Sequence, residues 1–349
     1  MAQGANDPAR VSRTSIYVAA GRALGAREPD AGARNPDSLA ERLLGDPSVL
    51  DLDHPAVRAL SLDYDEAMKD IEVIGIVRMM TVRTRFIDEA LGRATASGAK
   101  QVVILGAGFD SHAYRCRDLL AGAKVFEVDR PATQAFKKQR VNEVLGGPPP
   151  NLSYVAVDFG REDLTDIMAR HGCDPGQRTF FILEGVTMYL PEDAVRGTLR
   201  FVAAHAPGSG IVFDFVYRPL VEMLSRIDVA NVPAPARPFV QRFLDLIRDE
   251  PWVFGLPVGG ERDFLGALGL ELRETLAVGG DESSKRYLTR ADGTQVGAAA
   301  LAEAMTRMAR MRAESAAHGT AVPQISAETL REQQRVMSYQ LADAVVAAP

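Results

Sequence analysis

The sequence predicts an α/β fold: a doubly wound sheet of seven strands, preceded by a helical extension and carrying an inserted helical cap. From about residue 101 onward, short apolar runs of strand length alternate with helical stretches, which favours a parallel sheet with helices on both faces. Before that point no strand-like alternation interrupts the helical pattern. Residues 217–261 are helical, contain prolines and are too long for a simple connection, which indicates a cap.

The elements follow in order along the chain. We expect residues 1–96 to form the helical extension, with its longest helix over Tyr64–Leu91, and residues 97–349 to form the core with the cap. Strands are predicted at Gln101–Leu105, Lys124–Val128, Ser153–Val157, Thr179–Leu183, Ile211–Val216, Glu271–Ala277 and Ser338–Val346. Helices are predicted at Ser111–Leu120, Pro131–Leu145, Arg161–His171, Pro191–His205, Arg262–Leu268 and Ala298–Ala317.

Composition narrows the class of protein. The 349 residues include 40 basic and 46 acidic side chains, a net charge of −6, which disfavours nucleic acid and anionic membranes as partners. The two cysteines, Cys116 and Cys173, form no cluster with histidine, so we expect no metal site and no disulfide framework. Because the first residues contain no apolar segment of signal-peptide length, we expect a cytoplasmic protein.

Acidic side chains end three of the predicted strands. Asp129, Asp158 and Glu184 follow one another at intervals of 29 and 26 residues, about one strand–helix unit each, so they should meet at one edge of the sheet. Gly106 and Gly108 form a glycine turn after the first strand, at the same edge. These five residues are therefore candidates for one ligand site.

The details of the glycine turn argue against a pyrophosphate ligand. A dinucleotide fingerprint would have a third glycine where this chain has Ser111, and it would not place the carboxylate of Asp110 where a phosphate approaches. Asp129 nevertheless lies 21 residues past Gly108, the spacing at which a carboxylate accepts hydrogen bonds from ribose hydroxyls. A nucleoside without phosphates fits both observations.

S-adenosylmethionine is such a ligand. Asp158 could accept from the adenine amino group while Phe159 packs near the ring. The carboxylate of the methionine tail needs a guanidinium, which either Arg83 or Arg85 could supply, and Glu184 could face the ammonium and the sulfonium.

Five segments also carry a family resemblance. They are Arg83-Thr-Arg-Phe-Ile-Asp88, Leu105-Gly-Ala-Gly-Phe-Asp-Ser111, Phe126-Glu-Val-Asp129, Val157-Asp-Phe159 and Glu184-Gly-Val-Thr-Met-Tyr-Leu190. In this order they resemble the leucine carboxyl methyltransferase family and its bacterial branch of S-adenosylmethionine-dependent O-methyltransferases.

The resemblance implies a class I methyltransferase sheet and a role for each matching residue. Arg83 would hold the methionine carboxylate, Gly106 would allow the backbone to approach, and Asp129 would bind the ribose. By the same resemblance Asp158 and Phe159 would bind the adenine, and Glu184 would lie beside the methionine tail. The chain departs from the pattern at His112 and Thr187, where the branch often has arginine and a bulkier apolar residue.

We therefore expect methyl transfer from S-adenosylmethionine to a carboxylate, or a hydroxyl, of a small molecule such as a secondary metabolite; a protein C-terminus stays open as the acceptor. A carboxylate needs no general base, whereas a hydroxyl would, and His112 and Tyr189 are the candidate catalytic residues. Tyr189 is equally compatible with a place in the core. The alternatives are a NAD-dependent oxidoreductase on a similar sheet and a non-catalytic protein that binds S-adenosylmethionine.

Overall fold

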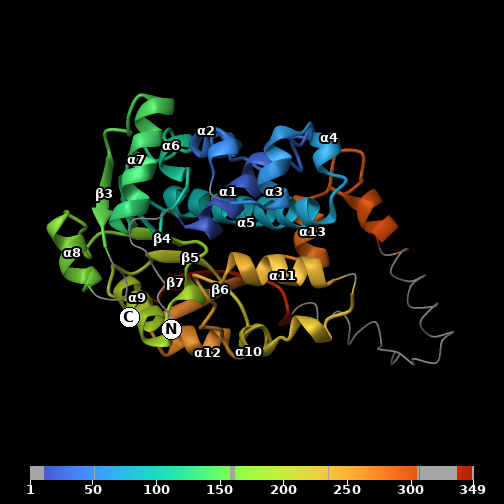
Figure 1. Ribbon diagram of the computed structural model, residues 1–349. Coiled ribbons are helices and arrows are strands. Elements are labelled where there is room, and N and C mark those ends of the chain that lie inside the picture. Colours follow the sequence, from blue (N-terminus) through green and yellow to red (C-terminus); the bar gives the residue numbers. More distant parts are fainter. Residues whose placement is uncertain are drawn as a thin grey trace.

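One seven-stranded sheet organises the computed structural model, which describes residues 12–50, 52–157, 162–234, 236–304, 306 and 336–347 (Figure 1). Its strands are β1 (Gln101–Leu105), β2 (Lys124–Asp129), β3 (Leu152–Ala156), β4 (Thr179–Leu183), β5 (Gly210–Phe215), β6 (Leu270–Ala277) and β7 (Gln340–Val346). The order across the sheet is β3-β2-β1-β4-β5-β7-β6. Strands β1 to β5 are parallel, and β7 is antiparallel to both β5 and β6. The predicted seven-stranded α/β fold is confirmed.

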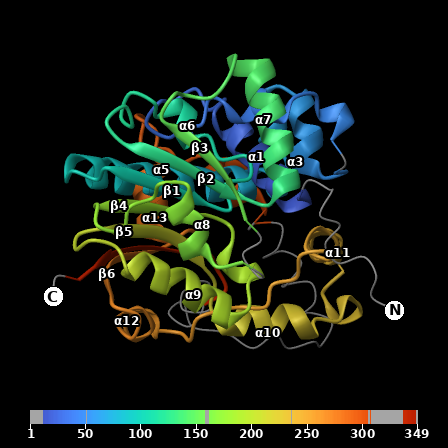
Figure 2. The ribbon, with the colours of Figure 1, turned by 90° about the vertical axis from the view of Figure 1, so that its left-hand side faces the viewer.

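Helices cover both faces of the sheet (Figures 1 and 2). Those before β1 are α1 (Arg13–Gly25), α2 (Ala40–Leu44), α3 (Pro55–Arg58), α4 (Tyr64–Ala67) and α5 (Ile71–Ala96), with 3-10 turns at Pro47–Val49 and Ala59–Ser61. Those between the strands are α6 (His112–Arg115), α7 (Pro131–Leu145), α8 (Leu164–Arg170), α9 (Glu192–Ala203), α10 (Arg218–Arg226), α11 (Arg237–Leu246), α12 (Glu261–Gly266) and α13 (Asp281–Tyr287). Further 3-10 turns are η3 (Thr187–Tyr189) and η4 (Val229–Asn231).

The central strands are mostly apolar because the sheet is buried on both faces. In β1, Val102 and Ile104 belong to the core shared with α1, α5 and α7. Val103 and Leu105 point the other way, into the core shared with α8, α9 and α12. The carboxyl ends of β1, β2, β4 and β5 consequently meet at one edge.

The N-terminal helices pack directly on the sheet. Helix α5 contacts β4, β5 and β7, and α1 packs along α5. Their approach is close: a Cβ at Gly21 would lie 2.9 Å from the Met80 side chain. Ala19, Ala20 and Ala23 of α1 are also fully buried. The extension therefore shares one hydrophobic core with the sheet and can supply side chains to the sheet edge.

Two predicted helices differ from the structure. The long helix expected over Tyr64–Leu91 is divided, because the Asp70 side chain accepts from the Glu72 backbone N–H and starts α5 afresh. The helix expected over Ser111–Leu120 ends at Arg115, whose guanidinium pairs with Asp88 of α5. Residues 116–122 follow as turns.

The stretch after β5, where a cap is predicted over residues 217–261, contains α10, η4 and α11. Trp252 packs against Phe243 of α11 and Tyr339, with ring centroids 5.4 and 5.3 Å apart. Of the helix predicted over Ala298–Ala317, residues 298–304 are helical, and most of the remainder lies outside the described residues. No helix in the described ranges is long and apolar enough to cross a bilayer.

Candidate active site

A cavity of about 440 Å³ lies over the carboxyl ends of β1, β2 and β4. Its floor comes from the glycine turn after β1 and from Asp129 and Glu184, and α5 contributes Arg83. Helix α1 and the residue before it form one wall, and the cap forms another with residues 249–251 and Val253. Segments from both ends of the chain thus enclose the predicted edge of the sheet.

The glycine turn presents bare backbone to this cavity. Gly106 has φ +68°, and a Cβ at this position would collide with the Val186 side chain. Gly108 has φ +42°, and its N–H donates to the Asp129 carboxylate at 2.5 Å. Both glycines are required by the backbone conformation, and Gly106 also by the close approach of the loop after β4.

Asp129 ends β2 and lines the cavity. Its two carboxylate oxygens accept one backbone N–H each, from Gly108 and from Arg130 at 2.7 Å. Burial raises the pKa of Asp129, while the two backbone hydrogen bonds act in the opposite direction. Each oxygen keeps a lone pair, so the carboxylate can still accept from ligand hydroxyls.

Arg83 is fully buried beneath the cavity between two carboxylates. Its Nη2 lies 2.5 Å from Glu184 Oε1, and its Nη1 donates to Asp214 at 3.0 Å. Burial raises the pKa of Asp214 to about 6, although the charge of Arg83 lowers it. Arg85 points elsewhere and donates to the carbonyls of Gly32 and Arg34. Of the two candidate arginines, only Arg83 lines the cavity.

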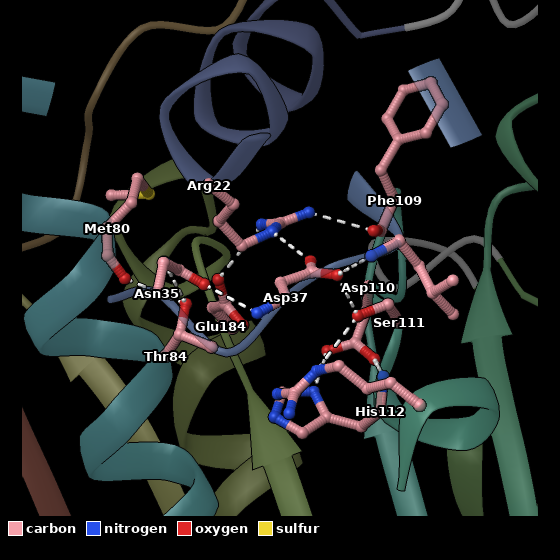
Figure 3. A network of polar contacts seen from close by, with 12 residues as sticks. Arg22, Asn35, Asp37, Met80, Thr84, Phe109, Asp110, Ser111, His112 and Glu184 are labelled. Carbon is pink, nitrogen blue, oxygen red and sulfur yellow. Dashed lines mark hydrogen bonds and ion pairs between the residues drawn. The ribbon is translucent and has the colours of Figure 1, made fainter. Parts of the chain in front are cut away.

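Arg22 of α1 ties the N-terminal extension to the glycine turn (Figure 3). Its Nε donates to Asp37 at 2.8 Å, and its Nη2 donates to the Phe109 carbonyl at 2.8 Å. Its Nη1 lies 3.5 Å from Glu184. Asp37 in turn accepts from the Ser111 hydroxyl at 2.6 Å. This network holds α1 over the same side of the cavity as Arg83.

His112, the candidate base, is buried outside the cavity lining. Its Nδ1 lies 2.6 Å from Asp110 and its Nε2 3.0 Å from Asp88. Burial lowers the pKa of His112, but the charge of Asp110 and the hydrogen bonds to both aspartates outweigh it and raise this pKa to about 9. Asp110, His112 and Glu184 could each bring one ligand atom within 4.8 Å of the others, yet a protonated imidazole offers a metal no lone pair. The structure gives His112 the role of a buried cation rather than a base.

This position predicts a pH-dependent contribution of His112 to stability. Because its folded pKa is about 9 and its unfolded pKa is about 6.5, its contribution is complete below pH 6.5 and disappears as the pH rises through 9. We expect the stability difference between wild type and His112→Asn to shrink by about 3 kcal/mol between pH 6 and 9.5. Urea denaturation of both proteins measures it. A difference that is constant over this range would show that His112 is neutral in the folded protein.

The cap meets α1 across the cavity at Glu250. Its carboxylate accepts from the hydroxyls of Ser12 and Thr14, both at 2.7 Å, and lies 3.0 Å from Arg130 Nη2. Tyr189, the second candidate catalytic residue, lines the same cavity. Burial raises the pKa of Tyr189 to about 12, so its phenol is protonated at neutral pH.

The structure brings together most of the residues predicted for the site. Arg83, Gly106, Gly108, Asp129 and Glu184 all line the cavity, whereas Asp158 and Phe159 lie outside the described residues. Four further residues at or beside the site were not predicted from the sequence. Arg22 and Asp214 lie beside Glu184 and Arg83, and Tyr339 and Glu250 lie toward the cap. Asp214 carried a usable signal, since it is a charged residue within the apolar run Ile-Val-Phe-Asp-Phe-Val.

The fold and the cavity together define a class I methyltransferase. In a dinucleotide-binding sheet the strand order is 3-2-1-4-5-6. Here the antiparallel β7 enters between β5 and β6, and a carboxylate faces the glycine turn. The profile of the leucine carboxyl methyltransferase family matches residues 15–203, and the chain belongs to this family.

Similar proteins from other organisms are also described as methyltransferases. A "Putative S-adenosyl-L-methionine-dependent methyltransferase" from Frankia alni is 35% identical over 222 residues, which are 63% of this chain and 74% of the relative. A protein of the same description from Streptomyces coelicolor is 34% identical over 251 residues, 71% of this chain and 83% of the relative. A solved structure of a putative methyltransferase from Thermobifida fusca is 16% identical, covers 93% of this chain and 97% of its own, and has a TM-score of 0.47.

Proposed function

We propose that this S-adenosylmethionine-dependent methyltransferase methylates a carboxylate of a small molecule. The family assignment and the antiparallel β7 argue against the alternative of a NAD-dependent oxidoreductase. Within the cavity, Asp129 would accept the ribose hydroxyls, Gly106 would allow close approach, and Arg83 and Glu184 would face the charged methionine tail.

The observation that favours a carboxylate acceptor concerns the side chains that could act as a general base in the cavity. Among the described residues, no histidine, lysine or cysteine lines the cavity. Tyr189 is protonated at neutral pH, and Glu250 is engaged by two hydroxyls and Arg130. A carboxylate nucleophile is already ionised, so the protein need only align it with the methyl group and exclude water. A hydroxyl acceptor would have to lose its proton to one of the carboxylates in the lining, such as Asp249, because no imidazole, amine or thiol among the described residues reaches the cavity.

The test is methyl transfer from methyl-labelled S-adenosylmethionine to a panel of carboxylic acids and matched alcohols and phenols. We expect label on carboxylic acids, in a product that mild alkali hydrolyses to methanol, as a methyl ester requires. Label that is stable to alkali on a phenol or alcohol would contradict the carboxylate proposal. Cofactor binding without transfer to any acceptor would favour the non-catalytic alternative.

The rate should also show little dependence on pH. A carboxylic acid with a pKa of about 4 stays ionised through the neutral range, so the single-turnover rate should be nearly constant from about pH 7 to 9. Below pH 6 it should fall as Asp214, whose pKa is about 6, takes up a proton beside Arg83. Rapid-quench measurements with the identified acceptor give this profile. A tenfold increase per pH unit through neutrality would instead indicate a hydroxyl acceptor.

A further inference from the structure

Tyr339 reaches the cavity from the far end of the chain. It directly precedes β7, and its backbone carbonyl accepts from Val278 at 2.9 Å, which fixes its position in the sheet. Its side chain lines the cavity, and its ring packs edge-on against Trp252 of the cap. Because β7 lies beside β5, Tyr339 lies next to the end of the strand that carries Asp214.

The hydroxyl of Tyr339 lacks a protein partner within the described residues. Other buried tyrosines donate to carboxylates: Tyr217 to Glu261, and Tyr287 to Glu89 at 3.0 Å. Burial raises the pKa of Tyr339 well above its usual value, so the phenol keeps its proton. A protonated phenol in a cavity wall is an available hydrogen-bond donor for a ligand.

The charge balance around Arg83 indicates why such a donor is needed. Two guanidiniums, those of Arg83 and Arg22, face Glu184; Arg83 also pairs with Asp214 and Arg22 with Asp37, so this end of the cavity is not positively charged overall. A ligand carboxylate that binds here meets repulsion that these paired arginines do not cancel. Gln340, the residue after Tyr339, pairs with Phe215, the residue after Asp214, so Tyr339 lies beside the strand end that carries Asp214.

We propose that the phenolic O–H of Tyr339 donates a hydrogen bond to the carboxylate of the amino-acid tail of bound S-adenosylmethionine, beside Arg83. This inference rests on the proposed function for its cofactor. It assigns to a residue outside the matched family region, 15–203, a role in holding the cofactor tail. A neutral donor adds binding energy without adding a charge to the buried ion-pair cluster.

The test compares two ligands in Tyr339→Phe, which removes one oxygen and keeps the ring that packs on Trp252. S-adenosylhomocysteine carries the amino-acid tail, and methylthioadenosine lacks it. By calorimetry we expect Tyr339→Phe to bind S-adenosylhomocysteine about tenfold or more weakly, because a hydrogen bond to a charged group is lost. Its affinity for methylthioadenosine should be unchanged.

Tyr154→Phe is the matched control. Tyr154 lies on β3, its hydroxyl contacts the hydroxyl of Tyr114, and it does not line the cavity. It should bind both ligands as the wild type does. Equal S-adenosylhomocysteine affinity in wild type and Tyr339→Phe would overturn the inference, and so would equal weakening of both ligands, which indicates a general packing effect. If the wild type itself binds neither ligand, the proposed function fails, whatever Tyr339 does.

Discussion

Arg83→Met should lower the free energy of unfolding by about 3 to 5 kcal/mol, because it leaves the buried Asp214 carboxylate without its cation and removes one of the two arginines beside Glu184. Asp214, whose pKa burial already raises, would then bind a proton still more readily in the folded protein than in the unfolded chain. Groups with a raised folded pKa stabilise at low pH and lose that contribution as the pH rises. The stability loss should therefore be smaller at pH 5 than at pH 8, as measured by urea denaturation.

Two further variants make this result specific. Arg85→Met removes a guanidinium from the same helix, but one whose hydrogen bonds within the described residues go to backbone carbonyls, so it should cost about 1 kcal/mol. Adding Asp214→Asn to Arg83→Met should restore part of the stability, because one unpaired charge is removed. If Arg83→Met were no less stable than Arg85→Met, the buried ion-pair cluster would not exist in solution.

Asp129→Ala should weaken S-adenosylmethionine binding by about 1 to 3 kcal/mol, a factor of roughly 5 to 150. The carboxylate is the proposed acceptor for the ribose hydroxyls, and it also holds the Gly108 N–H that shapes the glycine turn. Calorimetry on the folded variant measures the loss. Glu143→Ala, on the exposed side of α7, is the control and should bind normally. Wild-type affinity in Asp129→Ala would remove Asp129 from the site.

Local sequence patterns were sufficient to predict the sheet and the edge at which the cavity lies. Most of the parallel strands are short, mainly apolar runs, and acidic residues stand at the ends of two that form the cavity floor: Asp129 ends β2 and Glu184 directly follows β4. Helix boundaries were harder to predict from the sequence, because they depend on single contacts. The N-cap hydrogen bond of the Asp70 side chain divides one predicted helix. The pairing of Arg115 with Asp88 accompanies the early end of another.

Two of the missed site residues, Arg22 and Tyr339, come from segments whose own patterns say nothing about the cavity. Arg22 lies on a helix that reaches the glycine turn only because small residues let α1 pack closely on α5. Tyr339 reaches the site because β7 enters the sheet beside β5, a pairing between strands more than a hundred residues apart in the chain. No periodicity within either segment encodes these long-range contacts, so they became apparent only in three dimensions.

Trp252 gives this protein a built-in optical probe of its own cap. It is the only tryptophan in the chain, it is 8% exposed, and it follows Glu250, the residue that joins the cap to Ser12 and Thr14, by two positions. Any movement of the cap away from the cavity would transfer the indole from its aromatic neighbours, Phe243 and Tyr339, into water. Its emission would then shift to longer wavelength, so fluorescence would report such a movement without a label.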